Sequence, residues 1–294
     1  MRRITSSLIV LAMIAAFSPA IMSQAGEDSQ LGTFAFAIGN GMLAGGPQTV
    51  ADRLDGFDLI VVDGAEASSP EVAALRAGGA TVLAYLSVGT IERWRGWFQH
   101  VKRFRLGAWR DWEDEWFADV SKPALRRILV KRVAPDMLAK GFDGLFLDNV
   151  DMIEPRRFAG QREGMRKLVA RLARLTASTE GGLFAQNGFW GMRRFGILPH
   201  LDGWNREDVT WTWDFDRRRY VRNPNRDIRR ALSELEEVRG RGLLTMATNY
   251  TKRSTGRAVS ESVDDACSVG ALPYVGDIGL TAKRLPDPAA MACK

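Results

Sequence analysis

The stretch GFDGLFLDNVD, residues 141–151, decides the fold class of this chain. Gly141 ends a helix-length segment, residues 144–147 form a short apolar run, and polar residues begin at Asp148. An apolar run bounded in this way is typical of a parallel strand that is buried on both faces. The sequence therefore predicts a strand over 144–151, with Asp148 at the end where the sheet opens.

Seven further runs of the same kind flank this one, and we expect strands over 34–39, 58–64, 81–89, 182–187, 201–208, 243–250 and 271–276. Helical patterns lie between them over 70–77, 123–140, 164–178 and 224–240. Eight alternating units predict a single-domain α/β protein, a (β/α)8 TIM barrel. A doubly wound open sheet is the alternative, but it usually has fewer strands, and no glycine-rich phosphate loop follows the first strand.

The N-terminus has the pattern of a secretory signal peptide. Arg2 and Arg3 precede an apolar run over 8–17, and Ser23-Gln24-Ala25 is a small-residue cleavage site. The apolar run is about half the roughly 20 residues that cross a bilayer. We therefore expect residues 1–25 to be removed and residues 26–294 to form the barrel of a secreted or periplasmic protein, with no stable membrane insertion.

Composition argues against several partners. The 294 residues carry a net charge of +6, which falls to about +4 without Arg2 and Arg3. This charge is too small, and too scattered, to indicate nucleic-acid binding. We expect no cofactor, since no Walker loop, HExxH or GxSxG motif is present. We also expect a monomer. Cys267 and Cys293 could form a disulfide in an oxidising compartment, or remain separate thiols.

Polar residues at the predicted strand ends are mostly acidic: Asp63, Glu66, Glu92, Asp148, Asp151, Glu207, Asp208 and Asp277. Asn149, Asn187, Asn249, Tyr85, Tyr250 and Tyr274 accompany them. The two histidines, His100 and His200, are not at strand ends, which disfavours a zinc amidohydrolase and a Ser-His-Asp esterase. We expect no metal site. A barrel mouth of this kind suits glycoside hydrolysis, in which two carboxyl groups flank the cleaved bond.

Tryptophans near the strand ends would provide stacking surfaces for sugars: Trp94, Trp97, Trp190, Trp204, Trp211 and Trp213. The tryptophan-rich insert over 93–119 is expected to form a loop and helix that cover the barrel mouth.

Five blocks of the sequence resemble glycoside hydrolase family 114, the endo-α-1,4-polygalactosaminidases: YLSVGTIERWR (85–95), EWFADVSKP (115–123), GFDGLFLDNVD (141–151), AQN (185–187) and LDGWNRE (201–207). The resemblance implies a TIM barrel that cleaves α-linked, partly de-acetylated galactosamine polymers outside the cell. It also implies a catalytic Asp and Glu, which fall on Asp148 as nucleophile and Glu207 as general acid/base. Asp208 ranks second for the latter role.

The remaining polar and aromatic residues of the mouth are expected to bind substrate: Asp63, Tyr85, Glu92, Asn149, Asp151, Asn187, Trp204, Asp208, Tyr250 and Asp277. A ring of acids would attract a cationic polysaccharide, unless Arg93, Arg95 or Arg206 neutralises it. A retaining mechanism predicts carboxyl groups about 5–5.5 Å apart, and an inverting one about 6.5–9.5 Å.

Two other functions fit the same residues. A non-catalytic carbohydrate-binding barrel of the cell envelope would keep the aromatic mouth without turnover. A carboxylate-metal hydrolase would use Asp63, Asp148 and Asp151 to hold a hard cation.

Overall fold

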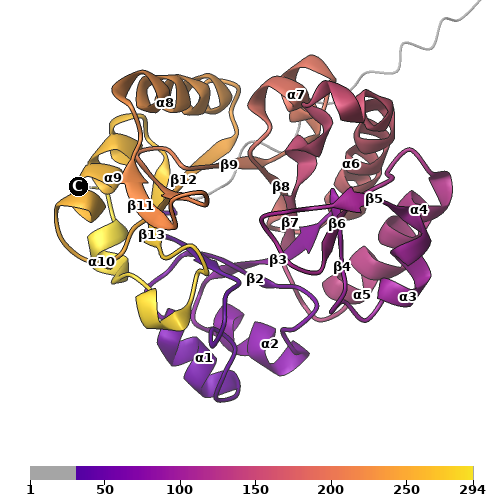
Figure 1. Cartoon of the computed structure of the whole chain (residues 1–294). Coiled ribbons are helices and arrows are strands. Elements are labelled where there is room, and N and C mark those ends of the chain that lie inside the picture. The colour runs from indigo at the N-terminus through magenta and orange to yellow at the C-terminus, as the bar shows by residue number, and fades with distance from the viewer. Residues whose placement is uncertain (1–30, 294) are drawn as a thin grey trace, which may run out of the picture. The chain divides into compact units, whose positions relative to one another are not determined.

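The computed structural model describes residues 31–293, which contain a barrel of eight parallel strands (Figure 1). The strands are β1 (Phe34–Ala37), β2 (Leu59–Asp63), β3 (Thr81–Ser87), β7 (Gly144–Asp148), β8 (Gly182–Gln186), β9 (Gly203–Glu207), β12 (Leu244–Tyr250) and β13 (Leu272–Gly276). Each pairs with the next in chain order. The rings of Phe34 and Tyr274, 5.9 Å apart, bring β13 beside β1. The predicted (β/α)8 TIM barrel is confirmed, and the open-sheet alternative is wrong because its strand order would depart from chain order.

Helices follow the strands and surround them (Figure 1). They are α1 (Pro47–Leu54), α2 (Ser69–Ala77), α4 (Pro123–Ile128), η2 (Leu129–Val133), α5 (Ala134–Leu138), η3 (Val150–Ile153), η4 (Arg156–Gln161), α6 (Arg162–Thr176), α7 (Phe189–Arg194), η5 (Leu198–His200), α8 (Asn225–Arg239), α9 (Arg257–Ser268), η6 (Ala282–Arg284) and α10 (Pro288–Met291). The helix predicted over 123–140 is present as α4, η2 and α5. Its middle turn is π-helical just before Pro135, which has no N–H to donate.

Two antiparallel insertions interrupt the barrel pattern. The first contains β4 (Thr90–Glu92), α3 (Phe98–Val101), η1 (Lys102–Phe104), β5 (Arg105–Ala108) and β6 (Glu115–Ala118), and its strands pair in the order β4-β6-β5. The second is the hairpin of β10 (Trp211–Asp214) and β11 (Arg219–Arg222). The expectation of a loop and helix over 93–119 was therefore wrong in part, because aromatic residues such as Trp116 and Phe117 favour strand pairing.

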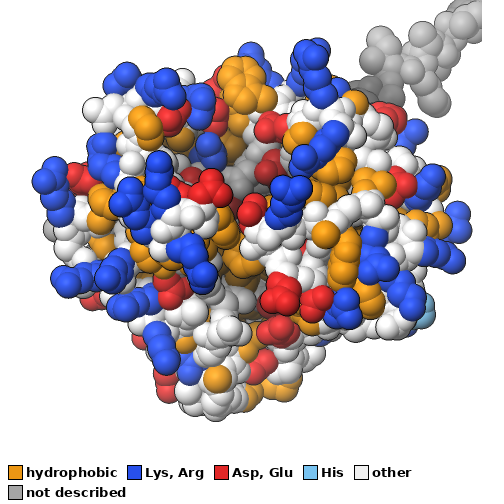
Figure 2. Space-filling view, viewed as in Figure 1, with side chains coloured by type: hydrophobic (Ala, Val, Ile, Leu, Met, Phe, Trp, Pro, Cys, Tyr) orange, Lys and Arg blue, Asp and Glu red, His pale blue; other side chains and the backbone are white. Residues whose placement is uncertain are grey.

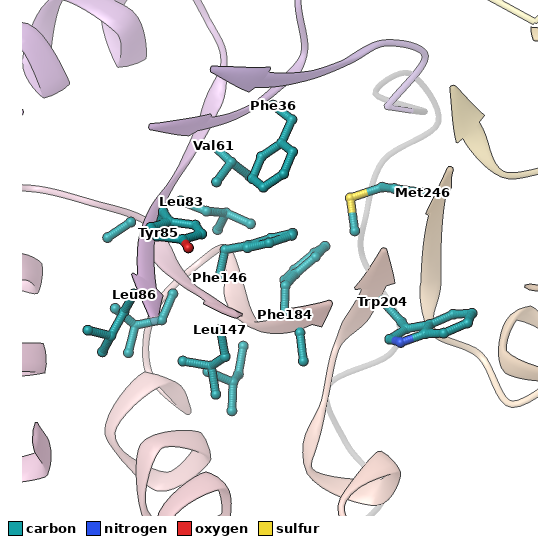
Figure 3. Close-up of a cluster of buried hydrophobic side chains, with 14 of the residues drawn as sticks. Phe36, Val61, Leu83, Tyr85, Leu86, Phe146, Leu147, Phe184, Trp204 and Met246 are labelled. Atoms are coloured by element: carbon teal, nitrogen blue, oxygen red, sulfur yellow. The ribbon is translucent and has the colours of Figure 1, made fainter. Parts of the chain in front are cut away.

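Large apolar side chains fill the barrel interior (Figure 3). The ring of Phe36 lies 5.2 Å from that of Phe146 and 6.2 Å from that of Tyr85, so three strands meet at one aromatic layer. Gly203 leaves the space that the ring of Phe184 occupies, since a Cβ at this position would lie 2.1 Å from that ring. This dense packing holds the strand ends in fixed positions.

The predicted signal peptide, residues 1–25, lies outside the described residues. Among residues 31–293, no helix is both long enough and apolar enough to cross a membrane.

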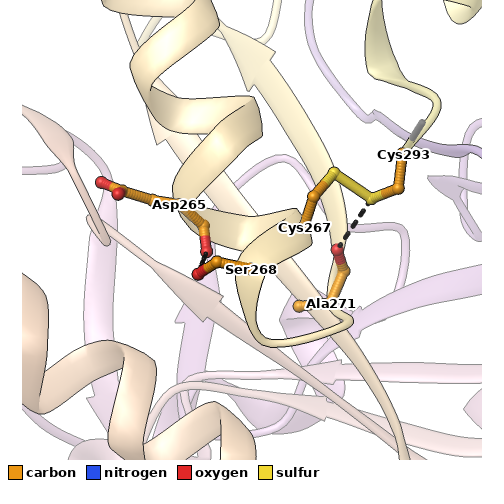
Figure 4. Close-up of a disulfide and its surroundings, with 5 residues drawn as sticks. All are labelled: Asp265, Cys267, Ser268, Ala271 and Cys293. Atoms are coloured by element: carbon orange, nitrogen blue, oxygen red, sulfur yellow. Dashed lines mark hydrogen bonds between the residues drawn. A yellow bond between two sulfur atoms is a disulfide. The ribbon is translucent and has the colours of Figure 1, made fainter.

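A disulfide joins Cys267, in the last turn of α9, to Cys293 in the C-terminal segment (Figure 4). The two residues are separated by 26 positions in the sequence. The first of the two alternatives for these thiols is therefore confirmed. The crosslink ties the C-terminal segment, which includes α10, to the barrel beside β13.

Replacing both cysteines by serine should lower the free energy of unfolding by about 2–4 kcal/mol, because the crosslink restricts the unfolded chain. Urea denaturation of the parent protein and the double variant at one pH measures the difference. Equal unfolding free energies would contradict a stabilising role for the disulfide.

Candidate active site

Three neighbouring barrel strands end at a residue with left-handed backbone conformation. Asn149 (φ 60°) follows β7, Asn187 (φ 54°) follows β8 and Asp208 (φ 56°) follows β9. Asn and Asp adopt this conformation more readily than other side chains, because their short polar groups can bond to the local backbone. The turns stop the strands at Asp148, Gln186 and Glu207, and all three of these terminal residues line one cavity.

This cavity has a volume of about 750 Å³, within the usual range for ligand sites of roughly 300–1,000 Å³. It lies at the mouth formed by the C-terminal ends of the strands, and Figure 2 shows acidic side chains at the central hollow, with basic ones beside it and over the rest of this face. One arginine, Arg95, lines the cavity together with eight carboxylic acids: Asp63, Glu66, Glu92, Glu115, Asp148, Asp151, Glu207 and Asp208.

Asp148 accepts three hydrogen bonds. The Tyr85 hydroxyl donates to Oδ2 at 2.5 Å, while the backbone N–H of Asn149 and the Gln186 amide donate to Oδ1 at 2.6 and 3.1 Å. Burial raises the pKa of Asp148, and these three donors oppose the rise because they favour the ionised form. Asp148 is therefore a buried carboxyl group whose two oxygens both accept hydrogen bonds from donors that favour its ionised form.

Gln186 is itself oriented by a chain of buried side chains. Thr248 Oγ1 donates to Asn205 Oδ1 at 3.1 Å, and Asn205 Nδ2 donates to Gln186 Oε1 at 2.9 Å. Gln186 Nε2 then donates to Asp148. These residues come from β12, β9, β8 and β7. Each donates to the next, so a chain of hydrogen bonds crosses four adjacent strands and ends at the Asp148 carboxyl group.

Glu207 lies in surroundings that favour its protonated form. Burial, with the charges of Asp148 and Asp208, raises its pKa to about 8. The Tyr250 hydroxyl and the Asn187 amide, 2.7 Å from Oε2, donate to the carboxyl and partly oppose this rise. Glu207 is therefore mainly protonated at neutral pH.

The two carboxyl groups enter the cavity from strands separated only by β8. Neighbouring strands lie about 4.8 Å apart, which places the backbones of β7 and β9 roughly 10 Å apart. The side chains of Asp148 and Glu207 both extend into the cavity from these strands. Two carboxyl groups thus share one cavity, one with a pKa raised to about 8 and the other with three donors that favour its ionised form. Glycoside hydrolysis uses a pair of carboxyl groups in these two roles.

Arg95 neutralises part of the acid ring. Its guanidinium contacts both oxygens of Asp63 at 2.7 and 2.6 Å, and both oxygens of Glu92 at 2.6 and 2.9 Å. Arg93 and Arg206 pair instead with Asp114 and Glu234, which do not line the cavity. The alternative in which an arginine pairs with acids of the ring therefore holds for Arg95, which pairs with two of the eight.

Two further acids of the cavity, Asp151 and Glu115, have pKa values raised to neutral pH or above. Burial, followed by the charges of Asp148 and Glu154, raises the pKa of Asp151 to about 7. Burial, followed by the charges of Glu92 and Asp148, raises the pKa of Glu115 to about 8. Because an adjacent cation favours the ionised form, a cationic ligand would lower both pKa values and strengthen its own attraction to the site.

Most residues predicted to bind substrate line the cavity: Asp63, Tyr85, Glu92, Asn149, Asp151, Asn187, Asp208 and Tyr250. Trp204 and Asp277 do not. Trp204 is fully buried and donates to the carbonyl of Asn187 at 2.7 Å, so it supports the turn after β8 and cannot stack on a sugar. Asp277 accepts from the Thr281 backbone and hydroxyl, at 2.9 and 2.6 Å, and so stabilises the loop after β13.

Several lining residues were missed because they lie on the two insertions: Glu115, Trp109, Trp112 and Phe215. Of the tryptophans predicted to stack on sugars, Trp94 alone lines the cavity. The EWFADVSKP block carries Glu115, and the aromatic content of the insert was a usable signal for the others. These side chains meet at the cavity because the two insertions fold back over the barrel, and the spacing of residues along the sequence does not predict this.

Within residues 31–293, no three His, Cys, Asp or Glu side chains are grouped so as to hold a metal ion. Asp63, which the metal hypothesis requires, is paired with Arg95. His100 lies in α3 and His200 in η5, and neither lines the cavity.

Comparison with known families gives a match over residues 18–202 to the model of glycoside hydrolase family GH114. The chain belongs to this family. It is therefore a glycoside hydrolase, and the acidic cavity is the candidate active site of a GH114 barrel.

Solved structures support the same fold for this GH114 protein. The glycoside hydrolase domain of PelA from Pseudomonas aeruginosa aligns with a TM-score of 0.68 and 24% identity, covering 84% of this chain and 94% of that domain. Ega3 of Aspergillus fumigatus, in complex with galactosamine, aligns with a TM-score of 0.65 and 15% identity, covering 86% and 93%. An uncharacterized protein of Deinococcus radiodurans is 25% identical over 253 residues, which are 79% of this chain and 77% of that protein.

Replacing Glu207 by Gln should stabilise the fold at alkaline pH. The folded pKa is raised, so the folded state loses stability as pH rises from the ordinary value of 4.5 to about 8. Gln cannot ionise. Above about pH 8, the free energy of unfolding of the variant should therefore exceed that of the parent by on the order of 1–3 kcal/mol.

Urea unfolding of the parent and Glu207→Gln at several pH values from 4 to 9 tests this expectation. Glu236→Gln, at an exposed position on α8, is the matched control. A stability difference that does not grow with pH would contradict the raised pKa of Glu207.

Proposed function

We propose that this glycoside hydrolase is an endo-glycosidase that hydrolyses α-1,4-linked, de-acetylated galactosamine polysaccharide by a retaining mechanism. Asp148 is the nucleophile and Glu207 the general acid/base. The observation that carries the proposal is the contrast between the two groups. Three donors favour the carboxylate form of Asp148, whereas burial and neighbouring charges raise the pKa of Glu207 to about 8.

The proposed reaction has two steps. Protonated Glu207 gives its proton to the glycosidic oxygen while Asp148 attacks the anomeric carbon, which breaks the bond to the leaving sugar and forms a glycosyl ester. The Glu207 carboxylate then takes a proton from a water molecule that attacks the same carbon and releases Asp148. The Tyr250 hydroxyl and the Asn187 amide hold Glu207 in place in both steps.

The acid ring supports a cationic substrate. Eight carboxylic acids and one arginine line the cavity, while the protein as a whole is basic. The negative potential of these acids attracts a polymer with free, protonated amines. It attracts a neutral glycan little and repels an anionic one. The galactosamine in the Ega3 complex has the same amino-sugar chemistry. We assign Asp63, Tyr85, Glu92, Asn149, Asp151, Asn187, Asp208 and Tyr250 to substrate binding.

We also propose that the protein is exported and that it acts as a monomer. The pattern over residues 1–25 supports a signal peptide and a secreted or periplasmic location, where a polysaccharide matrix is accessible. The reaction needs only the two carboxyl groups and water, so we propose that a monomer acts without a cofactor.

The parent protein should release reducing ends from de-acetylated α-1,4-galactosamine polymer. Asp148→Asn and Glu207→Gln should each lower the rate by at least about 100-fold, because each removes one half of the acid and nucleophile pair. A reducing-end assay measures the rates, with Glu236→Gln as the matched control.

A parent protein that binds this polymer tightly without cleaving it would favour the alternative of a carbohydrate-binding barrel. Full activity in either cavity variant would contradict the assigned catalytic pair.

The pH profile of kcat/KM should respond differently to two Tyr→Phe substitutions. Removing the Tyr85 hydroxyl raises the pKa of Asp148, so the acidic limb should move to higher pH. Removing the Tyr250 hydroxyl raises the pKa of Glu207, so the alkaline limb should move to higher pH. Each shift should be about 0.5–1 pH unit.

The two substitutions are controls for one another, because each leaves the other hydroxyl in place. If both variants moved the same limb, the assignment of ionised and protonated partners would be wrong.

A further inference from the structure

The exposed aromatic residues of this protein are concentrated at one place. Among residues 31–293, five large hydrophobic side chains are exposed, and three of them line the cavity: Trp94 (51%), Trp112 (39%) and Phe215 (41%). Apolar groups gathered in this way at a concave site indicate a surface that is covered when a ligand binds.

Two of these side chains come from insertions on different sides of the mouth (Figure 1). Trp112 lies in the loop between β5 and β6, an insertion between the third and fourth barrel strands. Phe215 lies in the turn between β10 and β11, between the sixth and seventh barrel strands. Asp148 and Glu207 end the fourth and sixth strands, so the catalytic pair lies on the arc between the two insertions.

The tips of the insertions meet through these rings. The centroids of Trp112 and Phe215 lie 6.0 Å apart with an interplanar angle of 71°, an edge-to-face contact. Across the described part of the chain, no hydrogen bond or ion pair joins the two insertions. The edge-to-face geometry of one aromatic pair contributes only about 3-fold to 10-fold beyond the burial of its rings, so few interactions hold the two tips together.

The bases of both insertions are firmly held. Asn249 Oδ1 accepts from the backbone of Thr210 and Trp211, at 2.6 and 3.0 Å, which anchors the start of β10. β6 pairs with β4 directly after the third barrel strand. The contact therefore joins the tips of two insertions whose bases are anchored. Both rings line the same cavity as Asp148 and Glu207.

We propose that Trp112 and Phe215 form an aromatic clasp that closes over a bound polysaccharide and makes cleavage processive. This inference rests on the proposed function. The clasp opens to admit an internal segment of the galactosamine chain and closes over the segment that occupies the catalytic pair. A long chain is then enclosed and stays bound through several cleavages, while a short oligosaccharide leaves from either side.

The test compares processivity in the parent with that in Trp112→Ala, Phe215→Ala and the double variant. The substrate is an insoluble film of de-acetylated α-1,4-galactosamine polymer, and the measured quantity is the ratio of soluble to film-bound reducing ends. Each single variant should lower this ratio by about 3-fold to 10-fold. The double variant should be no worse than either single one, because a clasp fails when one of its rings is lost.

Two controls separate the clasp from general effects of losing an aromatic residue. Trp112→Phe keeps an aromatic ring and should restore most of the ratio. Trp190→Ala removes another exposed tryptophan, which is 58% exposed on α7 and does not line the cavity, and should leave the ratio unchanged.

In a Glu207→Gln background, the same Ala substitutions should speed dissociation of the long polymer by a similar factor, and dissociation of a galactosamine tetramer by less. This measurement tests the clasp even if the parent binds the polymer without cleaving it.

Three results would overturn the clasp. If the parent is active and its Ala variants keep the same ratio of soluble to film-bound reducing ends, the clasp is contradicted and the proposed function is not. Effects that multiply in the double variant would show two independent stacking surfaces. A parent that neither cleaves nor binds the polymer would remove the proposed function and the clasp together.

Discussion

The hydrogen bonds that pass from Thr248 through Asn205 and Gln186 to Asp148 are the constraint on which the active site depends. They connect four adjacent strands. Each residue donates to the next, and the last donor, Gln186, bonds to Asp148. In this interior an unpaired amide or hydroxyl would be costly, so each member of the chain fixes the orientation of the next. The register of the barrel strands therefore determines how Asp148 is held.

Burial has different consequences for the two carboxyl groups that we propose as the catalytic pair. Desolvation raises the pKa of both Asp148 and Glu207. Asp148 has three donors that favour its charged form, whereas Glu207 has two donors and lies near the charges of Asp148 and Asp208. The difference in surroundings is what the proposed roles of general acid and nucleophile require, because one carboxyl group must hold a proton and the other must lose it near neutral pH.

The insertions complete what the barrel begins. The barrel strands provide the proposed catalytic pair and most of the acids, while the insertions add Glu115 and the rings of Trp109, Trp112 and Phe215. Loops on a rigid scaffold can change without loss of the core, so these segments are where relatives on the same fold can differ in how they hold a chain. The acidic cavity and the basic remainder of the protein differ in sign, so the attraction for the proposed cationic substrate is concentrated at the mouth.

The sequence by itself determined the barrel and its catalytic candidates. Apolar runs that end in acids mark buried parallel strands, and the ends of such strands must meet at one mouth, so the eight strands and the positions of Asp148 and Glu207 followed from local pattern. Only the tertiary structure decided which side chains face the cavity. Trp204 and Trp112 are both tryptophans near a strand or hairpin end, yet one is buried behind the turn after β8 and the other is 39% exposed in the cavity. Spacing along a chain cannot distinguish them, because exposure depends on contacts between segments far apart in sequence. The same is true of the buried hydrogen-bond chain and of the pairing of Arg95 with Asp63.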